Sequence, residues 1–112
     1  MHELAIIQSI VESVTDRLPD AQVTRVRLTI GRLSGVSVQS VQFCFGPVTE
    51  GTGLAGAELL VDEPAGMMHC RACGREFPSD DLLAVCACGS VDLDVIAGQE
   101  LLIRAVEVRD HV

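Results

Sequence analysis

The sequence predicts an α+β fold: a small three-stranded sheet with two helices, carrying a small inserted cysteine-rich domain near the C-terminal end. A helical pattern opens the chain, strand patterns follow it and return at the end, and four of the five cysteines lie close together before that return. We therefore expect an α+β domain over 1–66, completed by a strand within 98–112, and an inserted domain over 67–97.

The first seventeen residues predict a helix. Apolar side chains recur there at steps of three and four residues: Leu4, Ile7, Val11, Val14 and Leu18. Pro19 follows this pattern and should end the helix. A second helix is predicted after Ser37, whose hydroxyl suits an N-cap. Gly46-Pro47 is expected to end or kink this helix, and Cys44 should be a small buried hydrophobe.

Strands are predicted in four places. Residues 23–30 alternate, with Val26, Leu28 and Ile30 on one face, as a half-buried strand does. Further strands are expected over 57–62 and 91–96. The segment 101–108, rich in Leu, Ile and Val, reads as a closing strand that returns to pair with the earlier ones.

The cysteine-rich segment carries the pattern Cys70-x2-Cys73-x12-Cys86-x-Cys88, and a glycine follows each pair. Two such turns can offer four thiolates to a tetrahedral Zn²⁺. The segment has too few apolar residues for a core of its own, so the metal should fix its fold as a zinc-ribbon domain. Two alternatives stay open. His69 could replace Cys86 or Cys88 as the fourth ligand, or Cys70 and Cys73 could form a redox dithiol.

Composition excludes several classes of function. The chain has 112 residues and a net charge of −8, and only 3% of its residues are aromatic. Nucleic-acid binding needs a basic surface and often stacking rings, so we expect no nucleic-acid partner. The sequence has no apolar run of the roughly 20 residues that span a membrane, and no signal peptide. We therefore expect a protein of the cytoplasm, a compartment in which thiols stay reduced, and we expect no membrane partner.

The chain begins Met1-His2-Glu3. The α-amine of Met1 and the amide and imidazole nitrogens of His2 can close adjacent chelate rings, and Glu3 could supply a fourth ligand by backbone or carboxylate. Such nitrogen sets suit Ni(II) or Cu(II) in a planar arrangement. The alternative is that His2 and Glu3 are solvated residues of the first helical turn, where an acidic side chain is favourable.

Five segments resemble the hydrogenase-maturation nickel metallochaperones of the HypA/HybF family: MHELAIIQSIVE, VRLTIGRLSGV, the CxxCG turn, the CGS turn and GQELLIRAVEV. They occur in the family's order from one terminus to the other. The resemblance implies nickel at the Met1 amine, His2 and Glu3, and structural zinc at Cys70, Cys73, Cys86 and Cys88. It also implies two partners, the maturation GTPase and the large subunit of [NiFe]-hydrogenase. The second cysteine pair departs from the family's usual Cys-x2-Cys.

The resulting functional hypothesis is a nickel metallochaperone, not an enzyme, which acts as a monomer or weak homodimer. No nucleophile–base set, phosphate loop or carboxylate pair within a surrounding motif is visible in the sequence. The alternative hypothesis is a zinc-ribbon adaptor that binds another protein and carries no exchangeable metal. Dependence of metal binding on a free N-terminus distinguishes the two.

Overall fold

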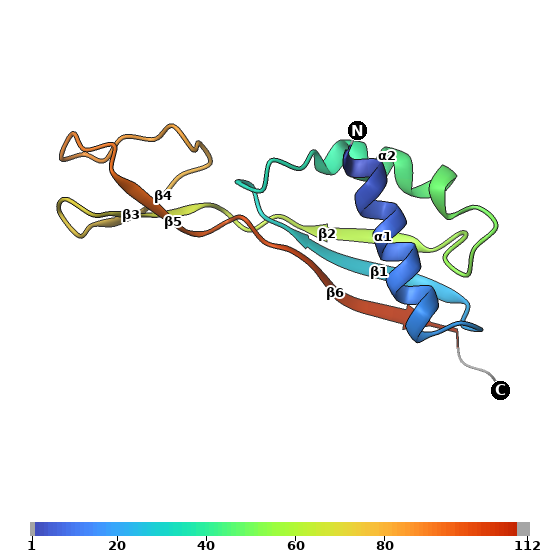
Figure 1. Cartoon of the computed structure of the whole chain (residues 1–112). Coiled ribbons are helices and arrows are strands. Elements are labelled where there is room, and N and C mark those ends of the chain that lie inside the picture. Colours follow the sequence, from blue (N-terminus) through green and yellow to red (C-terminus); the bar gives the residue numbers. More distant parts are fainter. Residues whose placement is uncertain (1, 110–112) are drawn as a thin grey trace. The chain divides into compact units, whose positions relative to one another are not determined.

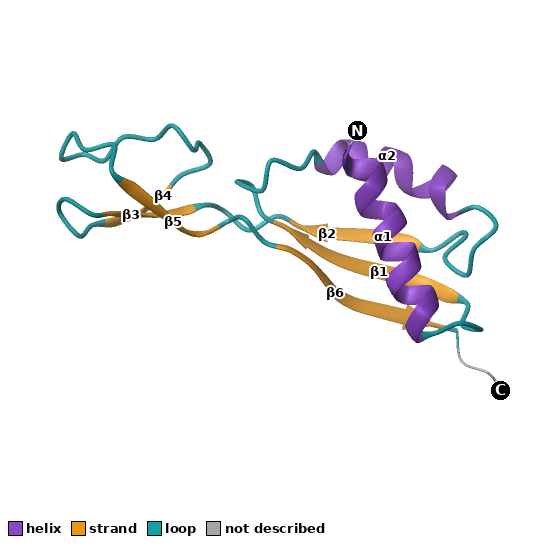
Figure 2. Cartoon of the chain, viewed as in Figure 1, coloured by secondary structure: helices purple, strands orange, loops and turns teal. Residues whose placement is uncertain are grey.

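The structure, a computed structural model, describes residues 2–109. Two helices and two small sheets form the fold, so the predicted α+β class is confirmed (Figures 1 and 2). Along the chain the elements are α1 (His2–Arg17), β1 (Val23–Ile30), α2 (Val38–Thr49), β2 (Glu58–Asp62), β3 (Met67–Cys70), β4 (Glu76–Pro78), β5 (Leu93–Ala97) and β6 (Leu101–Val108). Neither helix of the described part is long and apolar enough to cross a membrane.

The chain divides into two compact units. Within the described residues, the first unit contains 2–28, 37–61 and 103–109, and the second contains 29–36 and 62–102. The second unit is thus larger than the cysteine-rich segment 67–97, because the turn after β1 and the residues on either side of that segment belong to it. Its hydrogen bonds explain this: Arg32 N donates to Pro64 O, and Leu33 N donates to Gly98 O.

The first sheet has the strand order β2-β1-β6. The backbone N–H of Arg109 donates to Gln22 O, and Thr24 Oγ1 donates to Glu107 O, so residue numbers rise along β1 as they fall along β6. These two strands are therefore antiparallel. On the other side of β1, Val23 N donates to Gly53 O and Arg25 pairs with Glu58. Residue numbers rise together along the two segments, so β2 runs parallel to β1. A parallel pair needs a crossover, and α2 supplies it.

The core of the first unit lies between the helices and β1, as the periodicities predict. Val26 and Leu28 are at most 1% exposed, and the helices contribute Ile7, Ile10, Val14, Val41 and Phe45. Because α1 and α2 pack on each other, both cover the same face of the sheet (Figure 1). Strand β6 lies at the edge, and Leu101, Leu102, Ile103 and Val108 stay 41–49% exposed.

Helix α2 begins as expected but ends later. Ser37 is its N-cap, and its hydroxyl accepts from Ser40 N at 3.2 Å. The helix does not end at Gly46-Pro47; it continues to Thr49. Pro47 lies in the last turn, where only a short stretch of helical ladder remains to be interrupted. The Thr49 hydroxyl donates to Phe45 O at 2.7 Å, a side-chain bond that stabilises this turn. Cys44, expected to be buried, is only half-buried.

The second unit contains the sheet β4-β3-β5, in which both neighbours run antiparallel to β3. Sequence reasoning missed β3 and β4, which have four and three residues and are too short for a clear alternation. It also placed β5 two residues too early. The Ser90 hydroxyl accepts from Asp92 N at 3.0 Å, so the chain is still turning there and the strand begins only at Leu93.

Candidate functional site

The structure brings four cysteine sulfurs together in the second unit. The Sγ atoms of Cys70, Cys73, Cys86 and Cys88 all lie within 4.8 Å of one another. Two of the separations that join one pair to the other are 3.7 Å, between Cys70 and Cys88, and 3.6 Å, between Cys73 and Cys86. Zn–S bonds of about 2.3 Å in a tetrahedron place neighbouring sulfurs about 3.8 Å apart. The donor set and its spacing therefore fit a four-thiolate zinc ion.

Two turns present these sulfurs, and they differ in length. In the first, Cys70 N donates to Arg75 O and Gly74 N donates to Cys70 O. In the second, Gly89 N donates to Cys86 O, and Cys86 N donates to Ser90 O, which closes a turn one residue shorter. Gly74 and Gly89 have φ of 78° and 92°, a conformation that favours glycine. The short Cys-x-Cys pair is thus accommodated by a tighter turn.

The turn amides favour a thiolate at Cys70. The backbone N–H of Cys73 and that of Ala72 lower the pKa of the Cys70 thiol to about 6, against the opposing effect of burial. Ser90 N–H also favours the Cys88 thiolate, but the sulfurs of Cys86 and Cys70 beside it raise that pKa to about 11. Four neighbouring thiolates repel one another, and a bound divalent cation removes this repulsion.

Arg71, inside the first turn, ties the turn to β5. Its guanidinium pairs with both carboxylate oxygens of Asp94 and, at 3.4 Å, with Asp92 Oδ1. This bidentate pair holds the pKa of the Asp94 carboxyl below its usual range. The sequence analysis did not single out these three residues. The opposite charges of Arg71 and of the Asp92-x-Asp94 motif were the signal that could have predicted an ion pair between them. These residues support the cysteine cluster without contributing a ligand to it.

His69 is not part of the sulfur cluster. It precedes Cys70 in β3, and successive side chains of a strand point to opposite faces. Its Nδ1 lies 3.5 Å from Glu76 Oε2 on the neighbouring strand β4. Cys70 and Cys73 lie in one cluster with the sulfurs of Cys86 and Cys88, which favours a metal site over a redox dithiol formed by the first pair alone.

We expect His69→Ala to keep a full equivalent of zinc, whereas Cys86→Ala and Cys88→Ala each weaken zinc binding at least tenfold. The reason is that removing one thiolate opens the coordination shell, while the imidazole on the opposite face contributes nothing to it. Competition with a chromogenic zinc chelator measures the affinities. Release of zinc by His69→Ala, together with a thiol reagent labelling one cysteine of the zinc-bound protein, would show that His69 is a ligand.

The residues of the predicted nickel site lie at the start of α1. His2 is 63% exposed in its side chain, and its Nε2 lies 3.4 Å from Glu3 Oε2. The Glu3 side chain is nearly buried, and Oε2 accepts from Ser37 N at 3.4 Å, beside the N-terminus of α2. Such a position favours a carboxylate. The predicted ligand Met1 lies outside the described residues.

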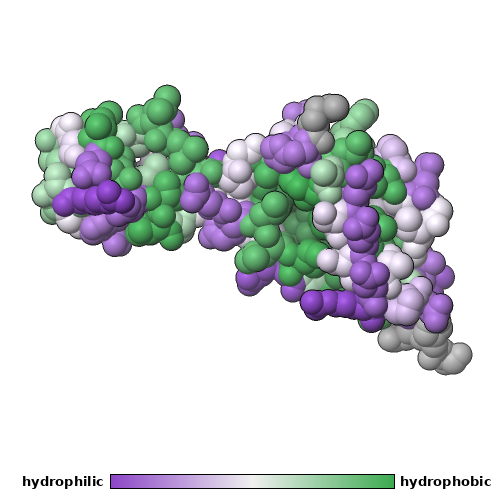
Figure 3. Space-filling view, in the orientation of Figure 1, coloured by the Kyte–Doolittle hydropathy of each residue, from purple (hydrophilic) through white to green (hydrophobic). Residues whose placement is uncertain are grey.

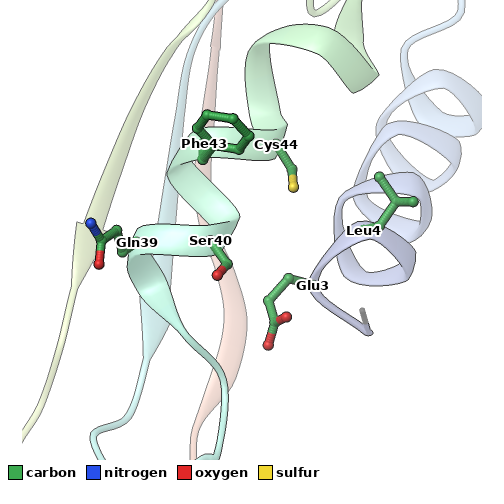
Figure 4. A pocket seen from close by; sticks show the side chains of 6 residues that line it. All are labelled: Glu3, Leu4, Gln39, Ser40, Phe43 and Cys44. Atoms are coloured by element: carbon green, nitrogen blue, oxygen red, sulfur yellow. The ribbon is translucent and has the colours of Figure 1, made fainter.

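Beside Glu3 there is a pocket of about 410 Å³ between α1 and α2. Figure 4 shows Glu3 and Leu4 on one side and Ser40 and Cys44 on the other, with the Cys44 sulfur directed towards α1. Sequence reasoning did not find the contact of Glu3 with Ser37. Residues 34 positions apart in sequence meet only because α2 packs on α1.

The chain is similar to known proteins over nearly its whole length. A family model described as "Hydrogenase/urease nickel incorporation, metallochaperone, hypA" matches residues 1–108. The protein called hydrogenase maturation factor HypA from Nostoc sp. is 44% identical over 110 residues, which cover 98% of this chain and 97% of that protein. The protein of the same name from Chlorobaculum tepidum is 42% identical over 112 residues and covers 96% and 99% of the two chains.

The fold has counterparts among solved structures. The solution structure of the Ni metallochaperone HypA from Helicobacter pylori matches with a TM-score of 0.62 at 21% identity, covering 96% of this chain and 97% of that one. A second solution structure of a HypA protein matches with a TM-score of 0.65 at 22% identity. These matches show the shared fold, while the family match rests on sequence over nearly the whole length. The chain therefore belongs to the HypA family of nickel-incorporating metallochaperones of hydrogenase maturation.

Proposed function

We propose that this protein binds Ni(II) at its N-terminus and delivers it to the large subunit of [NiFe]-hydrogenase, while a resident zinc ion holds the second unit together. The observation that carries the proposal is the family match over residues 1–108, which includes Met1, His2 and Glu3. Ni²⁺ is the cargo in this proposal, and Zn²⁺ is a structural cofactor held by Cys70, Cys73, Cys86 and Cys88.

The proposed nickel ligands are the Met1 amine, His2 and Glu3. The exposure of His2 supports the proposal, because a cargo site must be reachable for both loading and release. The carboxylate of Glu3 is held by Ser37 N–H, which fixes the start of α1 against α2. We infer that this contact limits the freedom of the first residues, so that less conformational entropy is lost when the chelate closes.

The proposed partners are the maturation GTPase and the hydrogenase large subunit, and the proposed compartment is the cytoplasm. The protein acts in this proposal as a monomer or weak homodimer that carries metal and catalyses no reaction.

Nickel transfer tests the delivery step. Zinc-loaded protein is charged with one equivalent of Ni(II) and mixed with the nickel-free large-subunit precursor in the presence of excess EDTA. We expect nickel to reach the precursor from the charged protein but not from free Ni(II), because direct transfer avoids the solvent where EDTA competes. Size-exclusion separation and elemental analysis of both fractions give the distribution.

His2→Ala, mixed with the same Ni(II), is the control and should transfer as little as free Ni(II). If EDTA blocks transfer from the wild-type protein as completely as from free Ni(II), delivery to the large subunit is refuted. If the untagged wild-type protein binds no nickel, the zinc-ribbon adaptor becomes the better description.

A further inference from the structure

The segment between β4 and β5 exposes apolar side chains to an unusual degree. Leu82 is 54% exposed, Leu83 87%, Val85 57% and Val91 74%. A single exposed leucine is ordinary on a protein surface, but a group of them on one small unit marks an interaction site. Figure 3 shows hydrophobic residues gathered over the loop that joins these two strands. We refer to residues 79–85 as the dileucine loop.

The dileucine loop is held in a fixed shape by its own polar groups. Asp81 Oδ1 accepts from Leu83 N at 2.8 Å, and the hydroxyl of Ser79 accepts from Asp81 N at 3.1 Å. Ala84 N donates to Asp81 O, and Asp80 pairs with Arg32 at 3.2 Å. The leucines are thus presented by a turn that is already ordered. Little conformational freedom is lost when a partner binds such a surface.

The cysteine cluster fixes both ends of this loop. Cys73 precedes it and Cys86 follows it, and their sulfurs are 3.6 Å apart. An ion bound by these sulfurs therefore determines the spacing of the chain on either side of Leu82 and Leu83. The resident zinc would then serve recognition as well as stability, because it would tie Cys86, directly after the loop, to the Cys70–Cys73 turn.

The charge around the loop selects the kind of partner. The second unit has eight acidic residues and three arginines, so it stays net negative although Arg32 pairs with Asp80 and Arg71 pairs with Asp92 and Asp94. Two copies of such a surface repel each other, which disfavours self-association through it. An apolar centre within an acidic surround is complementary to an apolar pocket bordered by Arg or Lys.

We propose that the dileucine loop docks into an apolar pocket with a basic rim on the nickel recipient, the hydrogenase large-subunit precursor; this rests on the proposed function. A carrier must hold its recipient while the metal transfers, so a recipient contact is the one interface that delivery requires. In this proposal the two units divide the work: the first carries nickel, and the second holds the recipient.

Calorimetric titration of the zinc-loaded protein into the purified precursor tests the proposal. The double substitution Leu82→Ser with Leu83→Ser should weaken binding at least tenfold, because central apolar anchors dominate the affinity of an interface. Leu83→Met should stay within about threefold of wild type, since it conserves volume and apolarity. Leu18→Ser, which alters an exposed leucine of the first unit, is the matched control and should bind like wild type.

Zinc content and the circular dichroism of every variant must match wild type, so that a folding defect is not mistaken for lost docking. Affinity should fall as salt is raised, because the basic rim faces an acidic surround. If the double variant binds the precursor as tightly as wild type, the proposal is overturned. If it loses binding only to the maturation GTPase or to a second copy of the chain, the proposed occupant is wrong.

The result is separable from the proposed function. Nickel titration of the double variant should match wild type, because the leucines lie outside the first unit. If the wild-type protein binds no nickel and yet binds the precursor through the leucines, delivery fails and the docking surface stands. If the double variant binds and transfers nickel and also binds the precursor with unchanged affinity, the delivery proposal stands and the docking proposal fails.

Discussion

Cys70→Ala or Cys73→Ala should each release the zinc ion and unfold the cysteine-bearing segment 67–97, while the helices of the first unit stay folded. The buried apolar residues of the second unit are few: Ile30, Leu33, Met68, Cys70 and Cys86. Two of these are themselves expected ligands. A structural zinc contributes on the order of 10–16 kcal/mol to small zinc-dependent domains, far more than so small a core can supply.

Zinc content by elemental analysis and two-dimensional NMR spectra measure the outcome. The purified wild-type protein should hold about one zinc per chain. Cys44→Ala is the matched control, because Cys44 lies on α2 and outside the four-sulfur cluster, and it should keep the zinc. Amide signals of 67–97 should collapse towards random-coil positions in the Cys70 and Cys73 variants alone. Full zinc retention by both variants would refute the four-thiolate site.

His2→Ala, or one extra residue before Met1, should abolish specific Ni(II) binding without changing zinc content or helix content. A site that uses the α-amine cannot tolerate extension, because acylation converts the amine into a non-basic amide. The imidazole of His2 supplies a second nitrogen, so its removal opens the chelate. Binding should also fade on acidification, as protons compete for amine, amide and imidazole nitrogens.

Nickel titration of the untagged wild type, His2→Ala and the extended form, all zinc-loaded, measures this. A planar nitrogen-rich site should give diamagnetic Ni(II) with a visible d–d band. His69→Ala is a control for imidazole loss elsewhere in the chain and should bind nickel normally. If the extended form binds as tightly as wild type, the amine is not a ligand; if His2→Ala does so too, the nickel site lies elsewhere.

The helices and strands that the sequence predicted best are those in which the periodicity of the apolar residues follows the element's geometry. The bounds of β1 and β6 match the predicted ranges, and α1 was visible because its apolar residues recur with helical period. Gly46-Pro47 was predicted to end or kink α2, and the helix does not end there but continues to Thr49, because Pro47 lies in its last turn. The strands β3 and β4 owe their existence to pairing with each other and with β5, which local propensity does not reveal.

The candidate sites divide in the same way. Cysteine spacing was enough to predict that four sulfurs meet, because turn geometry and thiolate chemistry are local. Spacing left the place of His69 undecided, since the alternation of β3 that separates it from Cys70 depends on a strand that was not foreseen. The contact between Glu3 and Ser37 was likewise out of reach, because it depends on how two helices pack.

The topology of the first sheet has a kinetic consequence. Strand β6 completes this sheet by pairing with β1, yet the whole cysteine-bearing segment lies between β2 and β6 in the chain. Pairing β6 therefore requires closure of a long loop, whose entropic cost grows with the logarithm of its length. An ion that binds both Cys70 and Cys88 shortens the effective length of the chain between β2 and β6. Zinc binding before β6 pairs with β1 should therefore lower the entropic cost of that pairing and make it faster.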